Sequence, residues 1–386
     1  MTPTSEAELA EIIATATAPF EIIGGGTRRI RCQKPPARPS PPPSLAGRTQ
    51  NRKRSGGAFS CVRGRGGGAG ALHTSGLSGI SLYEPEALTL VAKAGTPLAE
   101  IETLLAKHHQ HLPFEPYDLR PLQGTTGTPT IGGVVATNAS GPRRIQAGAC
   151  RDSLIGLRFV DGLGRIIQNG GRVMKNVTGY DLVKLMAGSH GTLGVLTEVS
   201  FKLHPAPEAT STVLVQEGEA TCAATMAKAM ASPYDISAAA HVRGVTALRL
   251  EGLDGSVRYR SEALALRLGG DVAPFDWATQ RDARAFAGGE GDVWRLSVKP
   301  SNGPATSEAL RAHGAKEVLF DWAGGLLWVL AEAGCDLRAG VTTGHATLIR
   351  GEGQAFHPEP APVAALSAAL RQKFDPRGLL NPGRMG

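Results

Sequence analysis

Residues 124–142 are built almost entirely of small side chains, in the order GTTGTPTIGGVVATNASGP. Small residues let a backbone approach a large flat ligand closely, while hydroxyl and amide groups offer hydrogen bonds to phosphate, ribityl or ring oxygens. Such groups are present on Thr130, Thr137, Asn138 and Ser140. The apolar members Ile131, Val134 and Val135 indicate packing, which a merely flexible loop would lack. We therefore predict a ligand-binding platform here.

A second glycine-rich motif follows a short apolar run at residues 20–23 and consists of Gly24, Gly25, Gly26 and Thr27. Consecutive glycines let several backbone N–H groups point into one concavity, which can hold a pyrophosphate without basic side chains. The motif matches neither a P-loop nor a Rossmann fingerprint, so it does not favour a nucleotide triphosphatase or an NAD fold. By itself it is equally consistent with a plain glycine turn.

A third motif spans residues 175–195, where a predicted short helix ends in glycines and enters a strand at 195–203. The turn contains Gly191, Thr192, Leu193 and Gly194, and Val195 opens the strand. Glycines at a helix end leave backbone N–H groups free for a ligand. The sequence thus predicts three backbone platforms.

In this order, the three motifs resemble the FAD-binding domain of the vanillyl-alcohol-oxidase-type flavoproteins, the PCMH fold. The resemblance is close over residues 74–206, includes the first 27 residues and extends to the tail FDPRGLLNPGR at 374–384. Within the family, the chain is similar to the FAD-binding subunits of glycolate oxidases. The resemblance implies an α+β fold, with a PCMH-type FAD-binding domain of two α/β subdomains at 1–206. A smaller, cap-like helix-on-antiparallel-sheet domain would follow at 207–386, with its tail returning to the flavin.

The resemblance also implies roles for matching residues. Gly24, Gly25, Gly26 and Thr27 would hold the pyrophosphate. The dinucleotide would be lined by Thr130, Ile131, Gly132, Gly133, Thr137, Asn138, Ser140 and Gly141. Gly191, Thr192, Leu193, Gly194 and Val195 would complete the adenine side, and Asn381 would return toward the flavin. Since no histidine stands near residues 24–27, we expect noncovalent FAD.

Relatives that oxidise 2-hydroxyacids directly carry a paired-histidine, metal-binding motif in the second domain. This chain has His345 and His357 there, twelve residues apart, without an H-x-G-x-G-x-x-H motif, so we predict no metal site and assign no catalytic residue. His345 and His190 are assigned structural roles on spacing alone. Arg143 and Arg144 are read either as an attractor of an anionic substrate or flavin phosphate, or as a solvated basic pair.

The resemblance implies a subunit that oxidises glycolate, a 2-hydroxyacid, to glyoxylate and passes electrons onward, beside a sister FAD subunit and an iron–sulfur subunit. The five cysteines are scattered without a C-x-x-C pair, so iron–sulfur clusters would belong to another chain. The alternative is a stand-alone FAD-dependent oxidase of a hydroxyacid or an alcohol.

Residues 28–72 differ abruptly in composition, being rich in proline, arginine and glycine. Between positions 28 and 65 nine arginines and two lysines occur without an acid, so this stretch carries +11 and the remainder −4. Too few apolar residues are present to offset the entropy of ordering, and disorder is expected. An out-of-frame piece of coding sequence is favoured over a solvated insertion. A nucleic-acid-binding or scaffolding arm is a distant alternative because aromatic residues are not interleaved.

The remaining pattern predicts a helix at 5–17, strands at 20–23 and 87–92, a helix at 97–105, and a hairpin of 154–160 with 165–168. In the second half it predicts helices at 220–231, 261–268 and 361–374, and strands at 247–250, 293–298 and 326–330.

No window approaches the roughly 20 apolar residues of a membrane span. The N-terminus lacks a basic region followed by an apolar run. We therefore expect a cytoplasmic protein that reaches the inner face of the cytoplasmic membrane only through partners.

Overall fold

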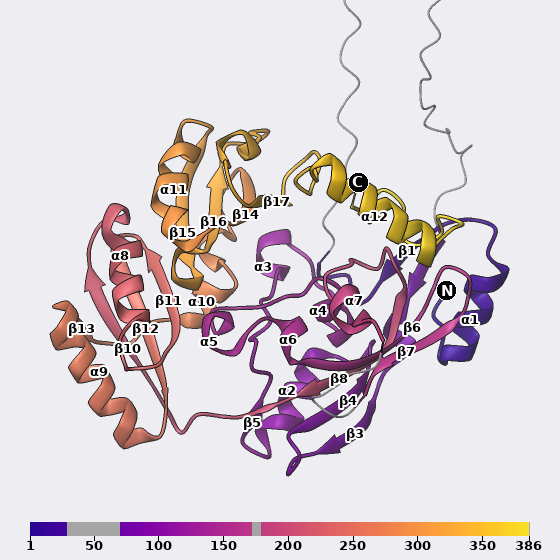
Figure 1. Ribbon diagram of the computed structural model, residues 1–386, viewed down its shortest axis with the longest axis horizontal. Coiled ribbons are helices and arrows are strands. Elements are labelled where there is room, and N and C mark those ends of the chain that lie inside the picture. The colour runs from indigo at the N-terminus through magenta and orange to yellow at the C-terminus, as the bar shows by residue number, and fades with distance from the viewer. Residues whose placement is uncertain (29–69, 172–178, 386) are drawn as a thin grey trace, which may run out of the picture.

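Two antiparallel sheets organise the chain, one of five strands and one of eight (Figure 1). The computed structural model describes residues 1–28, 70–171 and 179–385. Helices flank both sheets, and segments distant in sequence meet where the sheets face each other. The predicted α+β fold is confirmed.

The N-terminal helix α1 (Glu6–Thr15) leads into strand β1 (Phe20–Ile23), as predicted. Ser5 caps α1 by accepting a hydrogen bond from the backbone N–H of Glu8 at 3.2 Å. Strand β1 pairs in parallel with β2 (Gly70–His73), which was not predicted. This small sheet positions the glycine turn that follows β1.

The irregular segment predicted at 28–72 is too long at both ends. Arg28 is buried, and residues 70–72 belong to β2. The prediction erred because glycine and alanine at 70–71 carry little strand signal, whereas pairing with β1 orders them. Residues 29–69, which hold the rest of the predicted segment, lie outside the described part of the chain.

The five-stranded sheet has the order β3-β4-β8-β6-β7, and every neighbouring pair is antiparallel. Its strands are β3 (Ile80–Glu84), β4 (Thr89–Lys93), β6 (Leu154–Val160), β7 (Ile166–Gly170) and β8 (Val195–Lys202). The helical segments of this half are η1 (Thr74–Gly76), α2 (Leu98–Ala106), α3 (Arg120–Gln123), α4 (Ile131–Ala136), α5 (Arg144–Ala147), α6 (Cys150–Ser153) and α7 (Leu182–Met186). The predicted hairpin is β6 with β7.

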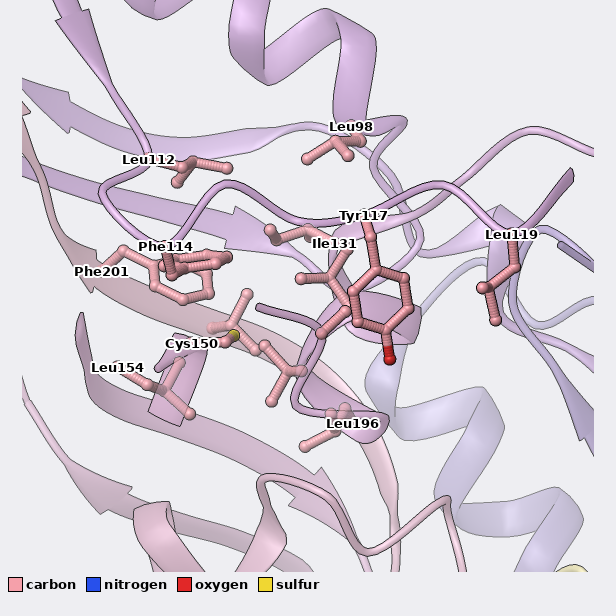
Figure 2. Packing of buried hydrophobic residues seen from close by; sticks show 14 of the residues in the cluster. Leu98, Leu112, Phe114, Tyr117, Leu119, Ile131, Cys150, Leu154, Leu196 and Phe201 are labelled. Carbon is pink, nitrogen blue, oxygen red and sulfur yellow. The ribbon is translucent and has the colours of Figure 1, made fainter. Parts of the chain in front are cut away.

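The core of this half lies between the sheet and its helices. Phe114 packs on Phe201 of β8 with ring centroids 5.4 Å apart, beside Cys150 and Leu154 (Figure 2). Ile131 of α4 points into the same cluster and is fully buried. Burial of this apolar surface fixes α4 against the sheet and thereby sets the position of the residues around it.

The eight-stranded sheet has the order β13-β10-β12-β11-β15-β16-β14-β17, again with antiparallel neighbours. Its strands are β10 (Ala209–Gln216), β11 (Ile236–Val242), β12 (Val245–Gly252), β13 (Asp271–Val272), β14 (Asp292–Ser297), β15 (Ala315–Asp321), β16 (Leu326–Ala331) and β17 (His345–Arg350). Helices α8 (Glu219–Met230), α9 (Asp254–Leu268) and α11 (Gly303–Arg311) lie on the side away from the five-stranded sheet (Figure 1). The remaining helical segments are α10 (Trp277–Arg281), η2 (Arg284–Phe286), η3 (Pro300–Asn302), η4 (Trp322–Gly324), η5 (Leu337–Gly340) and α12 (Ala361–Phe374).

Several elements of this half were missed or shortened in the sequence prediction. Helix α9 begins seven residues before the predicted 261, since its polar first two turns face solvent and give no apolar period. Strands β10, β11, β15 and β17 and helix α11 had not been assigned. The predicted helix 361–374 agrees with α12 at both ends.

Strand β16 is buried on both faces, which explains its unbroken apolar sequence. Leu327 and Val329 belong to the cluster under the helices, whereas Trp328 points to the other half and contacts Tyr117 at 5.9 Å between ring centroids. The two halves therefore share a continuous core. The short pair β5 (Gln110–His111) and β9 (His204–Pro205) precedes β10, and we propose the domain boundary at 206/207 between β9 and β10.

A buried charge network spans the same junction. Arg249 of β12 donates to both carboxylate oxygens of Glu115, at 2.9 and 2.8 Å. Arg143 donates to Glu251 at 2.6 Å, and its backbone N–H donates to Glu115 at 2.9 Å. Two cations and two anions thus neutralise each other where water is excluded.

Asp321, the last residue of β15, is fully buried beside this network. Burial raises the pKa of its carboxyl to about 7, although the backbone N–H of Trp322 and the charge of Arg249 oppose the shift. A raised folded-state pKa stabilises the fold at low pH, and this stabilisation is lost as the pH rises through 7. Because of Asp321, the free energy of unfolding of the wild type is expected to fall by about 2 kcal/mol between about pH 5 and pH 7. Asp321→Asn cannot ionise at this position and should not show this fall.

Urea unfolding at a series of pH values would measure this difference. Asp276→Asn is the matched control, because Asp276 also caps a short helix but its pKa is lowered, chiefly by the Thr279 hydroxyl. Its variant should run parallel to the wild type above about pH 5. A parallel curve for Asp321→Asn as well would contradict the prediction.

The C-terminal tail returns to β1. The N–H of Phe20 donates to Leu379 O at 2.7 Å, and the N–H of Asn381 donates to Phe20 O at 3.0 Å. The carboxylate of Asp375 accepts the backbone N–H groups of Leu379 and Leu380 at 3.0 and 2.8 Å. These bonds place Asn381 at the end of β1, where the glycine turn begins.

Candidate functional site

A pocket lies where β1, α4, the start of β8 and the C-terminal tail meet. Its wall includes the predicted residues Gly24, Gly25, Gly26, Thr27, Thr130, Gly132, Gly133, Thr137, Gly191, Gly194, Val195 and Asn381. All three predicted glycine-rich motifs and the tail thus contribute to one cavity.

The turn at 24–27 offers its backbone to this pocket. Its four N–H groups donate to no acceptor in the described part of the chain. Gly25 lies so close to the neighbouring loop that a Cβ would stand 1.5 Å from Thr128 O, so no side chain fits there. Gly26 has a φ of +72° and no atom within 4 Å of a built Cβ. The turn therefore contributes mainly backbone atoms to the pocket wall, and it packs closely against the loop at Thr128.

Helix α4 forms the next wall. Thr130 caps it by accepting the N–H of Gly133 at 3.3 Å, and Thr137 closes it by donating to Gly133 O at 2.8 Å. Gly132 packs just beyond the end of β4, where a Cβ would meet both Cβ and O of Ala94 at 2.7 Å. This close approach draws the small residues of α4 against the sheet and leaves the pocket open above them.

Asn381 joins the tail to the other two walls. Its side-chain Oδ1 accepts the N–H of Ile22 at 2.7 Å, while Nδ2 donates to His190 O at 2.8 Å. Gly191 has a φ of +72°, and a Cβ on it would stand 2.8 Å from Asn381 Nδ2. One buried amide therefore holds β1 and the turn before β8 at a fixed separation.

Replacing Asn381 with leucine is expected to lower the free energy of unfolding by about 2 kcal/mol, because two backbone groups lose their partner. The pocket should also lose ligand affinity as its walls separate. Asn302→Leu is the control, since half-buried Asn302 bonds only two hydroxyls, donating to that of Thr343 at 3.1 Å and accepting from that of Ser301 at 3.3 Å. Denaturant unfolding of both variants checks the prediction, and equal losses would contradict it.

Three charged or titratable residues in the wall were not predicted: Arg28, His190 and Arg384. Arg28 donates to Tyr117 O at 2.6 Å, while its buried Nε has no hydrogen-bond partner in the described chain. Burial lowers the pKa of Arg28. His190 is half-buried, and burial followed by the charge of Arg384 lowers its pKa to about 4, so the imidazole is neutral at neutral pH. Arg28 belonged to the segment assigned as irregular, and His190 had been assigned a structural role.

Arg384 comes from the C-terminal tail and lies 3.6 Å from the carboxylate of Glu21. Other lining residues were not predicted because they carry no distinctive chemistry: Ile22, Ile23, Thr74, Ala94, Ala136, Ser189 and Leu196. Ala136 and Ser189 lie within the predicted motifs at 124–142 and 175–195, one residue before the predicted Thr137 and two before the predicted Gly191. Thr74 and Ala94 lie far from the motifs in sequence, and only the sheet brings them in.

Six predicted residues do not line this pocket. Ile131 and Leu193 are in the core, and Thr192 closes a turn by donating to Ser189 O at 2.7 Å. Asn138 Oδ1 accepts the N–H of Arg151, and Ser140 Oγ accepts that of Cys150. The carbonyl of Gly141 accepts the indole N–H of Trp322 at 2.9 Å. A direct role for these six in binding the cofactor remains a prediction.

The wall fits a dinucleotide with a pyrophosphate. Free backbone N–H groups, glycines where a Cβ would obstruct the approach and an incompletely paired buried guanidinium suit a doubly charged, extended anion. Among the described residues no group of three or more His, Cys, Asp or Glu side chains is placed to bind a metal. Within the same part of the chain, no helix has the length and apolar character to cross a bilayer.

Fold and pocket together define an FAD-binding domain. The family model described as "FAD binding domain" matches residues 53–170. Solved structures of alkyldihydroxyacetonephosphate synthase share the fold, with a TM-score of 0.64 at 15% identity over 99% of this chain and 75% of that one. The predicted PCMH-type domain and FAD as its cofactor are confirmed.

Among curated proteins, the chain is 37% identical to glycolate oxidase subunit GlcE of Escherichia coli, over 80% of this chain and 84% of that protein. The chain belongs to the GlcE family. It is also 48% identical to glycolate oxidase subunit GlcD of Bacillus subtilis, over 22% of this chain and 18% of that protein. A D-lactate dehydrogenase of Archaeoglobus fulgidus is 36% identical over 30% of this chain and 24% of its own length. The chain is an FAD-linked oxidoreductase subunit of the class acting on CH–OH donors.

Proposed function

We propose that this chain binds FAD noncovalently in the pocket between β1, α4, β8 and the tail, as one subunit of a complex that oxidises glycolate to glyoxylate. The observation that best supports this proposal is the turn at 24–27, whose four residues line the pocket and whose N–H groups have no acceptor in the described chain. Membership of the GlcE family supports the choice of glycolate. When bound, FAD supplies the acceptor for the two electrons that leave the hydroxyacid.

The chain's own residues have distinct roles in this proposal. The N–H groups of residues 24–27 bind the pyrophosphate, and Arg28 supplies positive charge beside it. Asn381 keeps β1 and the turn at Gly191 in register, so that both contact the same ligand. Neutral His190 places no further charge in the wall.

We further propose that a sister FAD subunit and an iron–sulfur subunit complete the complex. The subunit names of the relatives GlcE and GlcD support a heteromeric assembly. The complex would be cytoplasmic and would contact the membrane at its inner face only through partners, with no nucleic acid bound. A stand-alone hydroxyacid or alcohol oxidase is the second candidate, favoured by the likeness to a D-lactate dehydrogenase.

The near-ultraviolet and visible absorption spectrum of the purified chain tests the proposal. We expect the two flavin bands, and we expect acid or heat to release all of the flavin from the protein. A folded but colourless chain would refute flavin binding, and flavin that stays with the precipitate would refute noncovalent attachment. Glycolate-dependent dye reduction by the isolated chain would instead favour the stand-alone oxidase.

A further inference from the structure

Four arginine side chains of the described chain stack on tryptophan rings, and two of these four lack a carboxylate partner. Arg249 lies 5.0 Å from the ring centroid of Trp277 and is paired with Glu115. Arg338 lies 4.7 Å from that of Trp294 and is paired with Asp336 at 2.8 Å.

The other two share one indole. The guanidinium carbons of Arg144 and Arg295 lie 4.1 and 4.9 Å from the ring centroid of Trp322. Neither side chain has a hydrogen bond or an ion pair within the described residues, and Arg295 Nε is buried without a partner. Arg249 and Arg338 each stack on a tryptophan and are also paired with a carboxylate. Stacking alone therefore does not explain why Arg144 and Arg295 lack a carboxylate partner.

The two guanidiniums come from different halves of the molecule. Arg144 begins α5, next to the small-residue segment, whereas Arg295 lies in the middle of β14. Both are half-buried. Burial and then the charge of Arg295 lower the pKa of Arg144, as expected for two like charges that share one ring.

Trp322 is anchored by two hydrogen bonds. Its indole N–H donates to Gly141 O at 2.9 Å, and its backbone N–H donates to Asp321 Oδ1 at 2.7 Å. Its φ is +52°, a conformation that costs a bulky residue free energy and that persists where the surroundings enforce it. The strained backbone and the two hydrogen bonds of Trp322 thus set the position of the ring on which Arg144 and Arg295 stack.

One titratable side chain lies near these two cations. His345 opens β17 opposite Ser297 of β14, and burial followed by the charges of Arg295, His357 and Arg144 lowers its pKa. A small anion bound between the guanidiniums would relieve their repulsion. Forked guanidinium donors match the two oxygens of a carboxylate.

We propose that Arg144, Arg295 and Trp322 form a binding site for the carboxylate of a small hydroxyacid, at the junction of the two halves. The inference rests on the proposed function for the identity of the acid, and it adds the residues of this chain that recognise it. Arg143, the other member of the basic pair, has a different role, since it is paired with Glu251 in the buried network.

Isothermal titration calorimetry of the full, FAD-loaded chain with glycolate tests the site, and glycolamide, which lacks the carboxylate, is the ligand control. We expect glycolate to bind the wild type and glycolamide to bind at least about tenfold more weakly. Arg144→Met and Arg295→Met should each weaken glycolate binding by about tenfold or more. Arg338→Met removes a matched arginine–tryptophan stack and should bind glycolate as the wild type does.

Flavin absorbance of the same samples separates the two proposals. Flavin bands without glycolate binding, equal binding of both ligands, or an equal loss in Arg338→Met would overturn the carboxylate site and leave the proposed function standing. Absence of flavin would instead contradict the proposed function. If Arg295→Met fails to fold, Arg144→Met decides alone, because its side chain is at the start of a one-turn helix.

Discussion

Purified Gly26→Ala protein is expected to retain less than about a tenth of the FAD that the wild type binds. Gly26 lines the pocket, and its Cβ position faces open space, where the pyrophosphate must approach the backbone. An added methyl group would occupy that approach. The ratio of flavin to protein absorbance after gel filtration measures the effect.

Gly269→Ala is the matched control for this variant. Gly269 has a φ of +68° and open space around a built Cβ, like Gly26, but it ends helix α9 far from the pocket. Both variants incur the same backbone penalty of about 1 kcal/mol for alanine at positive φ. Only Gly26→Ala should lose flavin. Equal flavin contents in the two variants would show that the turn does not bind the pyrophosphate.

Glu115→Gln is expected to lower the free energy of unfolding by about 3–5 kcal/mol, because it leaves the buried Arg249 with one anion fewer. The side chain of Arg249 is only 5% exposed and that of Glu115 19%. Urea unfolding at neutral pH measures the loss. Glu317→Gln is the control, since Glu317 forms a similar two-point contact with Arg243, which is 66% exposed. There we expect less than about 1 kcal/mol.

The loss in Glu115→Gln should also depend on pH. Burial opposes ionisation of Glu115, but Arg249 and Arg143 outweigh it and lower its pKa. A lowered folded-state pKa stabilises the fold above the unfolded value of about 4.3, and the stabilisation disappears as the pH falls through the folded value. The difference between wild type and variant should therefore narrow in acid. A constant difference would show that lost packing, not lost charge, causes the destabilisation.

Local sequence sufficed for features that depend on backbone conformation or on one uninterrupted pattern. The turn at 24–27 was predicted because glycine after an apolar strand is a strong local signal, and α12 was predicted because proline and aspartate bracket its alanine-rich run. The hairpin of β6 and β7 followed from the Asp-Gly turn between them. Family resemblance then assigned most of the residues that line the pocket.

Features that depend on contacts between distant segments could not be read in this way. The order of the eight-stranded sheet joins strands that are not consecutive, and β15 and β17 carry no pattern that separates them from loops. Asn381 bridges residues 359 and 191 positions away. Asn138 and Ser140 have the same chemistry as Thr130, yet they bond the chain around α6.

Arg143 and Arg144 show the division most clearly. By itself, the sequence determined that two guanidiniums stand side by side at the end of a small-residue segment. Successive residues entering a helical turn project about 100° apart, so the fold directs them to different surroundings. Arg143 meets Glu251 and Glu115 in the buried network, whereas Arg144 lies on Trp322 without a counter-ion in the described chain. Only the packing of the two halves decided which arginine is structural and which is available to a ligand.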